Sequence, residues 1–165
     1  DITFTSTSGS GTKTFTTVSA ANGIIDISAA TGNITAQSIS TSATAGKTIT
    51  ITVSQTDGLL THSTGAIETN GGLIRLSADN MTLSGGTITS NVSSGAADDR
   101  LRPTDAAQNI QIGAGATDSS SALGLTDAEL NIITTGAGNT IIVGQSTVTG
   151  TISVVGALNL TVKNL

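Results

Sequence analysis

Pairs of apolar residues two positions apart recur along this chain at an almost constant distance. The first four pairs begin at Ile2, Ile25, Ile49 and Ile74. Their separations are 23, 24 and 25 residues, and the residue inside each pair is polar. Alternation of apolar and polar residues is typical of a strand that buries one face, and a strand repeat of about 20 to 25 residues is typical of a β-solenoid. We therefore expect residues 1–165 to form one all-β segment, a right-handed single-stranded parallel β-helix.

The later part of the chain continues the pattern with less regular spacing. Three further pairs begin at Ile110, Ile141 and Leu160, after steps of 36, 31 and 19 residues. Counting each pair as one turn predicts about seven turns of three short strands, with Gly, Asn and Ser at the corners. The first residues of the pairs then form one inward column, and the second residues, beginning with Phe4, form another. A β-sandwich stays open as an alternative, because Asn22 with Gly23 could form a tight hairpin turn.

The composition fits a stack of like residues. Ser and Thr fill 51 of the 165 positions, whereas the chain has two Phe, no Trp, no Tyr and no Cys. These counts argue against a helical bundle, a disulfide-stapled miniprotein and an aromatic platform for nucleic acid. Intrinsic disorder is opposed by 18 Ile residues and a mean hydropathy of +0.21. In a solenoid, aliphatic residues stack inward and uncharged hydroxyls face solvent.

The charge of the chain limits its partners. The net charge is −5, and only six Lys and Arg residues are scattered along the chain. Such a chain cannot neutralise a row of phosphates, so we expect no nucleic acid as partner. No apolar run approaches the roughly 20 residues that cross a bilayer, so we expect no membrane insertion. The chain opens at Asp1 without a basic and apolar leader, and we expect it to be a segment of a longer protein.

Two segments interrupt the regular turns and are expected to leave the helix as loops. The first, 90–108, carries most of the local charge, and the second, 117–139, contains the sequence LTDAEL. Thr126 and Glu129 in this sequence have the spacing of a capping box. We therefore predict a short helix near 126–133, with Leu130 and Ile133 packing back on the core.

The charged segment supplies the only candidate contact residues. Five of the 17 charged residues lie within eight positions: Asp98, Asp99, Arg100, Arg102 and Asp105. Carboxylates on a parallel β-helix could act in a polysaccharide lyase or glycoside hydrolase, and this stays open as an alternative. A solvated loop is the simpler interpretation, because the chain lacks the aromatic residues that would hold sugar rings. We expect the protein not to be an enzyme.

Motifs for cofactors and metals are incomplete. Residues 41–48 end in Gly-Lys-Thr like a phosphate-binding loop, but a strand follows where that loop needs a helix. His62 is the only His and there is no Cys, so we expect no zinc or copper site within one chain. The glycine pairs at 71–72 and 85–86 lack the Asp of calcium-binding solenoid repeats. We therefore expect no cofactor and no metal.

An ice-binding face would need Thr-x-Thr in every turn. Thr50 belongs to such a pattern, but its predicted equivalents are Asp26 one turn earlier and Arg75 one turn later. The threonine array is therefore broken.

Three stretches carry a family resemblance. Residues 1–7 (DITFTST), 76–90 (LSADNMTLSGGTITS) and 123–134 (LGLTDAELNIIT) resemble repeat segments of giant bacterial exoproteins of the filamentous haemagglutinin type. The resemblance covers most of the chain through degenerate motifs. It implies a right-handed β-helical shaft, secretion by the two-partner or autotransporter route, and a role in adhesion or biofilm formation.

The expected function is therefore that of a structural shaft segment in a secreted adhesin or extracellular filament on the bacterial cell surface. Neighbouring β-helix repeats, or copies of the chain stacked end to end, are the expected partners, together with a host or cell-surface receptor that the sequence does not identify. A phage or viral fibre segment is a further alternative, although the polar outer face predicted here is less suited to it.

Overall fold

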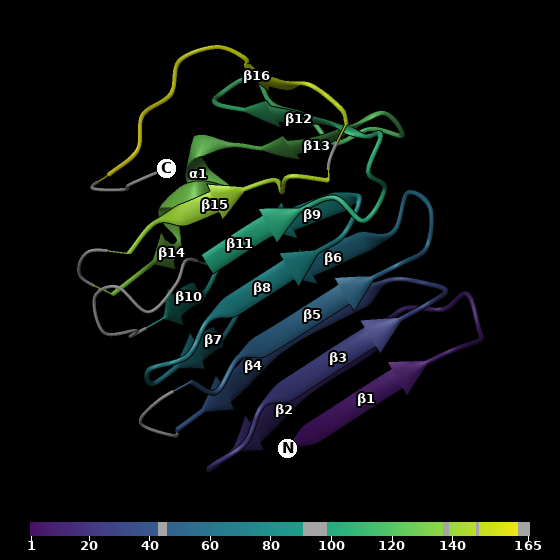
Figure 1. Cartoon of the computed structure of the whole chain (residues 1–165), viewed down its shortest axis with the longest axis vertical. Helices are drawn as coiled ribbons and strands as arrows, with labels where there is room; N and C mark the ends of the chain where they lie inside the picture. The colour runs from purple at the N-terminus through teal and green to yellow at the C-terminus, as the bar shows by residue number, and fades with distance from the viewer. Residues whose placement is uncertain (43–45, 91–98, 137–138, 148, 162–165) are drawn as a thin grey trace.

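The chain folds as an all-β parallel β-solenoid of about four turns in a computed structural model (Figure 1). The structure describes residues 1–42, 46–90, 99–136, 139–147 and 149–161. Every ladder between its strands is parallel in these ranges, which rules out the antiparallel sandwich considered above.

The first sheet is a stack of six parallel strands. In spatial order its strands are β1 (Ile2–Ser6), β3 (Ile25–Ala29), β5 (Ile49–Val53), β8 (Ile74–Ser77), β11 (Asp99–Arg102) and β15 (Ile141–Val143). Ile25 pairs with Ile2 on one side and with Ile49 on the other, and Ile49 pairs with Ile74. The register predicted from the steps of 23, 24 and 25 residues is therefore confirmed.

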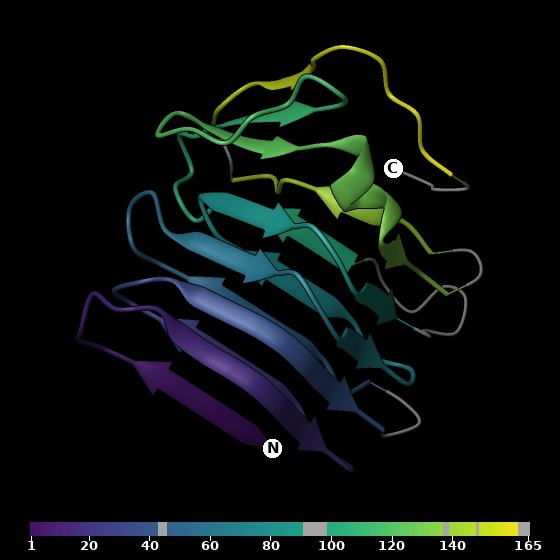
Figure 2. The ribbon, with the colours of Figure 1, turned by 180° about the vertical axis from the view of Figure 1, so that it is seen from behind.

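The second sheet forms the opposite side of the solenoid (Figure 2). Its strands are β2 (Lys13–Ala20), β4 (Ile34–Thr41), β6 (Leu59–His62), β7 (Ala66–Thr69), β9 (Asn80–Leu83), β10 (Thr87–Ser90) and β14 (Ile133–Thr134). The start of β4 pairs with β6 and its end with β7, so the long strand of the second turn becomes two strands in the third. Three strands per turn, as predicted, therefore begin only at the third turn.

The corner between the two short strands that replace the long strand depends on glycine. Gly86, between β9 and β10, has a φ of +74°, and a Cβ there would lie 2.3 Å from the carbonyl oxygen of Gly65 in the turn below. Gly65 has a φ of +81° at the equivalent corner. A side chain at either position would meet both a strained backbone and an adjacent turn.

A third sheet continues the stack beyond β9 (Figures 1 and 2). It consists of β13 (Ala122–Leu125), β12 (Asn109–Ile112) and β16 (Ile152–Val154). The helix α1 (Asp127–Asn131) follows β13 in the chain. The predicted capping box is confirmed, because Thr126 Oγ1 accepts from the amide of Glu129 and the Glu129 carboxylate accepts from the amide of Thr126. Leu130 and Ile133 are buried as expected.

Carboxylates separate the second sheet from the third. The amide of Met81 donates to Asp118 Oδ2 at 3.0 Å, and the amide of Leu83 donates to Glu129 Oε1 at 3.1 Å. Asp118 Oδ1 also accepts from the amide of Gly124 in β13, at 2.8 Å. Side chains thus satisfy the β9 amides that would otherwise join a ladder with β13.

This arrangement makes stability depend on pH. Burial against the protein raises the pKa of Asp118 from 3.8 to about 6, and the nearby Glu129 also raises it, although the amides of Gly124 and Met81 lower it. The folded chain therefore binds more protons than the unfolded chain between about pH 4 and pH 6. We expect the Asp118 contribution to the free energy of unfolding to fall as pH rises through this window, and Asp118→Asn to remove this slope.

Urea unfolding at pH 4, 5, 6 and 7 measures the effect. Asp26→Asn is the matched control, because Asp26 points outward from β3 and should leave the slope unchanged. Equal slopes for the native chain and Asp118→Asn would contradict the prediction.

The prediction of seven turns is wrong, because the pairs after Ile74 do not mark successive turns. Ile74 is followed in the first sheet by Asp99 and then by Ile141, whereas Ile110 belongs to β12 in the third sheet. Leu160 lies outside the strands and packs partly buried against the core.

Both predicted loops contain regular structure. Segment 90–108 includes β11, which is a rung of the first sheet with Leu101 in the core. Segment 117–139 includes β13 and β14 as well as the helix. The chain leaves the regular coil in these places, but it returns to add strands to the stack.

The core is aliphatic and lies between the sheets. Ile25, Ile27, Ile49 and Ile51 are completely buried, as the inward columns predicted. Phe4 departs from this prediction, with 43% of its surface exposed, because β1 has a strand on one side only. Its ring instead packs on Phe15, with 5.3 Å between the ring centres.

The outward positions follow the predicted register as well. Thr50 pairs with Asp26 in β3 and with Arg75 in β8, so the threonine array is broken as expected. Within the described ranges, no helix has the length and apolar character needed to cross a membrane.

Candidate functional site

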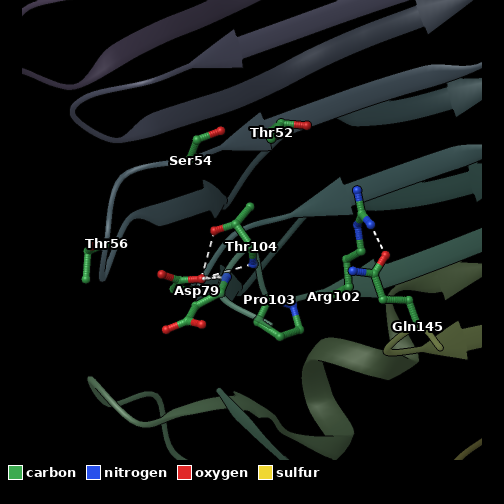
Figure 3. Close-up of a pocket in the computed structure, with 9 residues that line it drawn as sticks. Thr52, Ser54, Thr56, Asp79, Arg102, Pro103, Thr104 and Gln145 are labelled. Carbon is green, nitrogen blue, oxygen red and sulfur yellow. Dashed lines mark hydrogen bonds between the residues drawn. The ribbon is translucent and has the colours of Figure 1, made fainter. Parts of the chain in front are cut away.

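A polar pocket of about 390 Å³ lies where strands β5, β8, β11 and β15 of the first sheet end (Figure 3). Its lining comes from several turns: Thr52, Ser54, Thr56, Asp79, Arg102, Pro103, Thr104, Asp105 and Gln145. Carboxyl ends of parallel strands meet at one edge of a sheet, so residues up to 93 positions apart in sequence gather here.

Asp79 organises one wall of the pocket. The residue is 3% exposed, and its Oδ1 accepts hydrogen bonds from the amide and hydroxyl of Thr104, at 3.0 and 2.7 Å, and from the amide of Asp105 at 2.8 Å. Its Oδ2 accepts from the amide of Asp57 at 3.2 Å. A carboxylate with four donors holds the loop after β11 in place.

Arg102 forms the other wall. Its Nε donates to Ser77 Oγ at 2.9 Å, and its guanidinium also donates to Gln145 Oε1 (Figure 3). A guanidinium has five N–H donors. The two bonds fix its orientation and leave donors for a group inside the pocket.

The structure divides the predicted contact residues between two environments. Asp99 is 2% exposed and points into the solenoid, whereas Arg100 and Arg102 point outward from the same strand. Asp105 is exposed at the pocket, where its Oδ1 accepts from the amide of Ala107 at 2.8 Å. Asp98 lies outside the described residues. Asp99 and Asp105 therefore do not form a carboxylate pair.

Asp99 has a structural role that sequence reasoning missed. In the three earlier rungs, the amides of Ile2, Ile25 and Ile49 donate to backbone carbonyls of the next turn. The amide of Ile74 donates instead to Asp99 Oδ1 at 2.8 Å, and Asp99 Oδ2 accepts from the hydroxyl of Ser90. The carboxylate thus replaces a backbone acceptor.

The remaining motifs do not contribute to this pocket. Thr48 leads directly into strand β5, so the segment resembling a phosphate-binding loop lacks a following helix; its residues 43–45 lie outside the described part. His62 is completely buried in the core, with Nδ1 2.9 Å from the carbonyl oxygen of Ala36. No group of three or more potential metal ligands is found among the residues that the structure describes.

Asp79, Gln145 and Ser54 were not singled out by the sequence, and Thr52 was considered only within a Thr-x-Thr pattern. Each is an isolated polar residue in a chain rich in such residues, and only the stacking of turns brings them together. Comparisons of the chain with protein-family models, curated proteins and solved structures find no match. The structure therefore defines a parallel β-solenoid with a polar pocket at one edge.

Proposed function

We propose that the chain is a structural shaft segment of a secreted bacterial surface adhesin or extracellular filament, acting as a spacer in adhesion or biofilm formation. One observation carries the proposal: the large hydrophobic residues that are exposed, among those described, lie in or near the two end strands. They are Phe4, Ile24, Ile152, Val154 and Leu158.

The two ends differ from the sides of the solenoid. At one end, Phe4 of β1 is 43% exposed, and at the other, Ile152 and Val154 of β16 are 57% and 62% exposed (Figures 1 and 2). In the described chain β1 pairs only with β3, and β16 only with β12. A strand edge beside exposed apolar side chains can accept a further turn of the same kind.

Apolar ends and polar sides support growth along the axis in preference to sideways association. The contact would be heterologous, because one end of a copy meets the other end of the next, and such contacts produce open filaments. We also propose a right-handed winding, the hand that nearly all parallel crossover connections share. Export to the cell surface by the two-partner or autotransporter route rests on the family resemblance.

A non-enzymatic role is part of the proposal. The pocket carboxylate of Asp79 is occupied by four donors, and Asp99 is buried in the stack. These contacts give both carboxylates a structural role, which supports the proposal.

End-to-end association can be measured by analytical ultracentrifugation and electron microscopy. We expect the native chain to form rods that lengthen with concentration, and Ile152→Lys with Val154→Lys to prevent this by placing charge at the apolar end. Thr50→Lys, on the side of the solenoid, is the control and should associate like the native chain. A strictly monomeric native chain at high concentration, or equal loss with the control, would contradict self-stacking.

A further inference from the structure

Three of the six basic residues of the chain lie on the outer face of two adjacent strands. Arg75 belongs to β8, and Arg100 and Arg102 belong to β11. Their neighbours in the strands point into the core, so all three side chains point away from it. This cationic surface, defined here as the arginine face, stands on a chain with a net charge of −5.

Arg75 and Arg100 lie directly opposite each other in the parallel ladder. Adjacent strands are about 4.8 Å apart, and like charges in facing positions are destabilising. Asp26 is on the same row, but Thr50 separates it from Arg75. On the other side of Arg100 the row continues with Ile142. Within the described residues, neither guanidinium has a carboxylate in the adjacent position of this row.

Arg100 also carries an unsatisfied donor. Its Nε is buried, and no hydrogen-bond partner for it exists in the described part of the chain. A buried donor without a partner costs free energy, more so when the group is charged. An oxyanion between Arg75 and Arg100 would accept hydrogen bonds from both guanidinium groups and remove the repulsion between them.

The arginine face continues into the pocket. Arg102 follows Arg100 by two residues on the same side of β11 and lines the pocket with Gln145 and the hydroxyl groups of Thr52 and Ser54. Pro103 is the only apolar residue in this lining, which offers little surface for a nucleobase or a lipid chain. The lining also includes the carboxylates of Asp79 and Asp105 and has no aromatic residue. Its hydroxyl, amide, guanidinium and carboxylate groups instead match a ligand that is itself rich in hydroxyls and is held by hydrogen bonds in place of ring stacking.

We propose that the arginine face and the adjoining pocket bind an acidic sugar, with the carboxylate of a uronate held between Arg75 and Arg100 and a neighbouring sugar ring in the pocket beside Arg102. This site lies on the side of the solenoid and does not depend on the shaft role. Binding removes the cost of the facing guanidinium groups, so the ligand stabilises the folded chain by mass action.

Nuclear magnetic resonance titration of the whole chain with digalacturonate tests the site. We expect shifts in the amides of β8, β11 and the pocket, and a dissociation constant on the order of 1 mM or lower. Arg75→Gln and Arg100→Gln should each weaken binding at least tenfold. Lys47→Gln removes a positive charge elsewhere and should leave the affinity unchanged. Arg75→Gln should also raise the melting temperature of the free chain, because it relieves the repulsion; this readout shows that the variant is folded.

The probes separate the two parts of the proposal. Neutral digalactose should not bind measurably, and acetate and inorganic sulfate should bind more weakly than digalacturonate. Arg102→Gln should reduce the affinity for digalacturonate but not that for acetate. Equal binding of digalactose, unchanged affinity in Arg75→Gln and Arg100→Gln, or no shifts at all would overturn the site. Equal affinity for acetate and digalacturonate would overturn the role of the pocket.

Discussion

Replacing Ile51 by Asp is expected to abolish the folded state. Ile51 is completely buried in the first sheet, stacked between Ile27 and Leu76 in the turns on either side. The change loses about 1.5–3 kcal/mol of apolar burial and places a carboxylate among aliphatic side chains, which costs several kcal/mol more. The total exceeds about 5 kcal/mol, comparable with the whole stability of many domains. Urea unfolding followed by far-ultraviolet circular dichroism should show no cooperative transition.

Thr50→Ala is the matched control, because Thr50 is the adjacent residue and points outward. We expect it to change the free energy of unfolding by about 0.5 kcal/mol or less. Ile51→Val should fall between the two, at about 1 kcal/mol, because it removes a single methylene from the core. Similar unfolding midpoints for Ile51→Asp and Thr50→Ala would show that the inward assignment of Ile51 is wrong.

Removing the carboxylate of Asp79 is expected to cost about 3–5 kcal/mol. Asp79→Ala leaves the amides of Asp57, Thr104 and Asp105 and the hydroxyl of Thr104 without their acceptor. The hydroxyl of Thr104 keeps a second partner in the carbonyl oxygen of Val53, at 3.0 Å, so the loss falls mainly on the amides. The loop after β11 should also exchange its amide hydrogens faster, which hydrogen-exchange mass spectrometry can measure.

Asp105→Ala separates this effect from a simple loss of charge in the pocket. Asp105 is exposed and accepts one hydrogen bond, from Ala107, so we expect a loss of about 1 kcal/mol or less. Asp79→Asn retains one oxygen acceptor and should lie between the two alanine variants. If Asp79→Ala and Asp105→Ala destabilise the chain equally, Asp79 does not hold the loop as described.

The first four rungs could be predicted from sequence because their signal is local. Alternating residues in Ile25–Ala29 and Ile49–Val53 identify strands, and equal steps between them set the register. The helix at Asp127–Asn131 was predictable for the same reason, since Thr126 and Glu129 cap it within one turn.

The next rung was missed although it has the right spacing. Asp99 lies 25 residues after Ile74, but an Asp in a column of Ile argues against burial when the sequence is considered alone. Its burial is possible because the amide of Ile74 and the hydroxyl of Ser90 satisfy the carboxylate. These partners are distant in sequence or in another strand, so no local sequence pattern predicts these hydrogen bonds.

The pocket was predictable only in part. Arg102 and Asp105 stand out as members of a charged cluster, whereas Thr52 and Gln145 are ordinary residues of a polar chain. These residues come together only if the number of residues in each turn is right, and the irregular steps after Ile74 made that number impossible to predict. The third sheet was missed for the same reason.

The carboxylates of Asp118 and Glu129 bear on how the solenoid would respond to tension. Along most of the axis, one turn is joined to the next by backbone ladders, but on the β9 side two side chains make the connection. The ladders from β8 to β11 and from β10 to β14 continue past this level. A pull along the axis would therefore open the β9 side first while the other sides hold, and the rod would bend at this level before any turn separated.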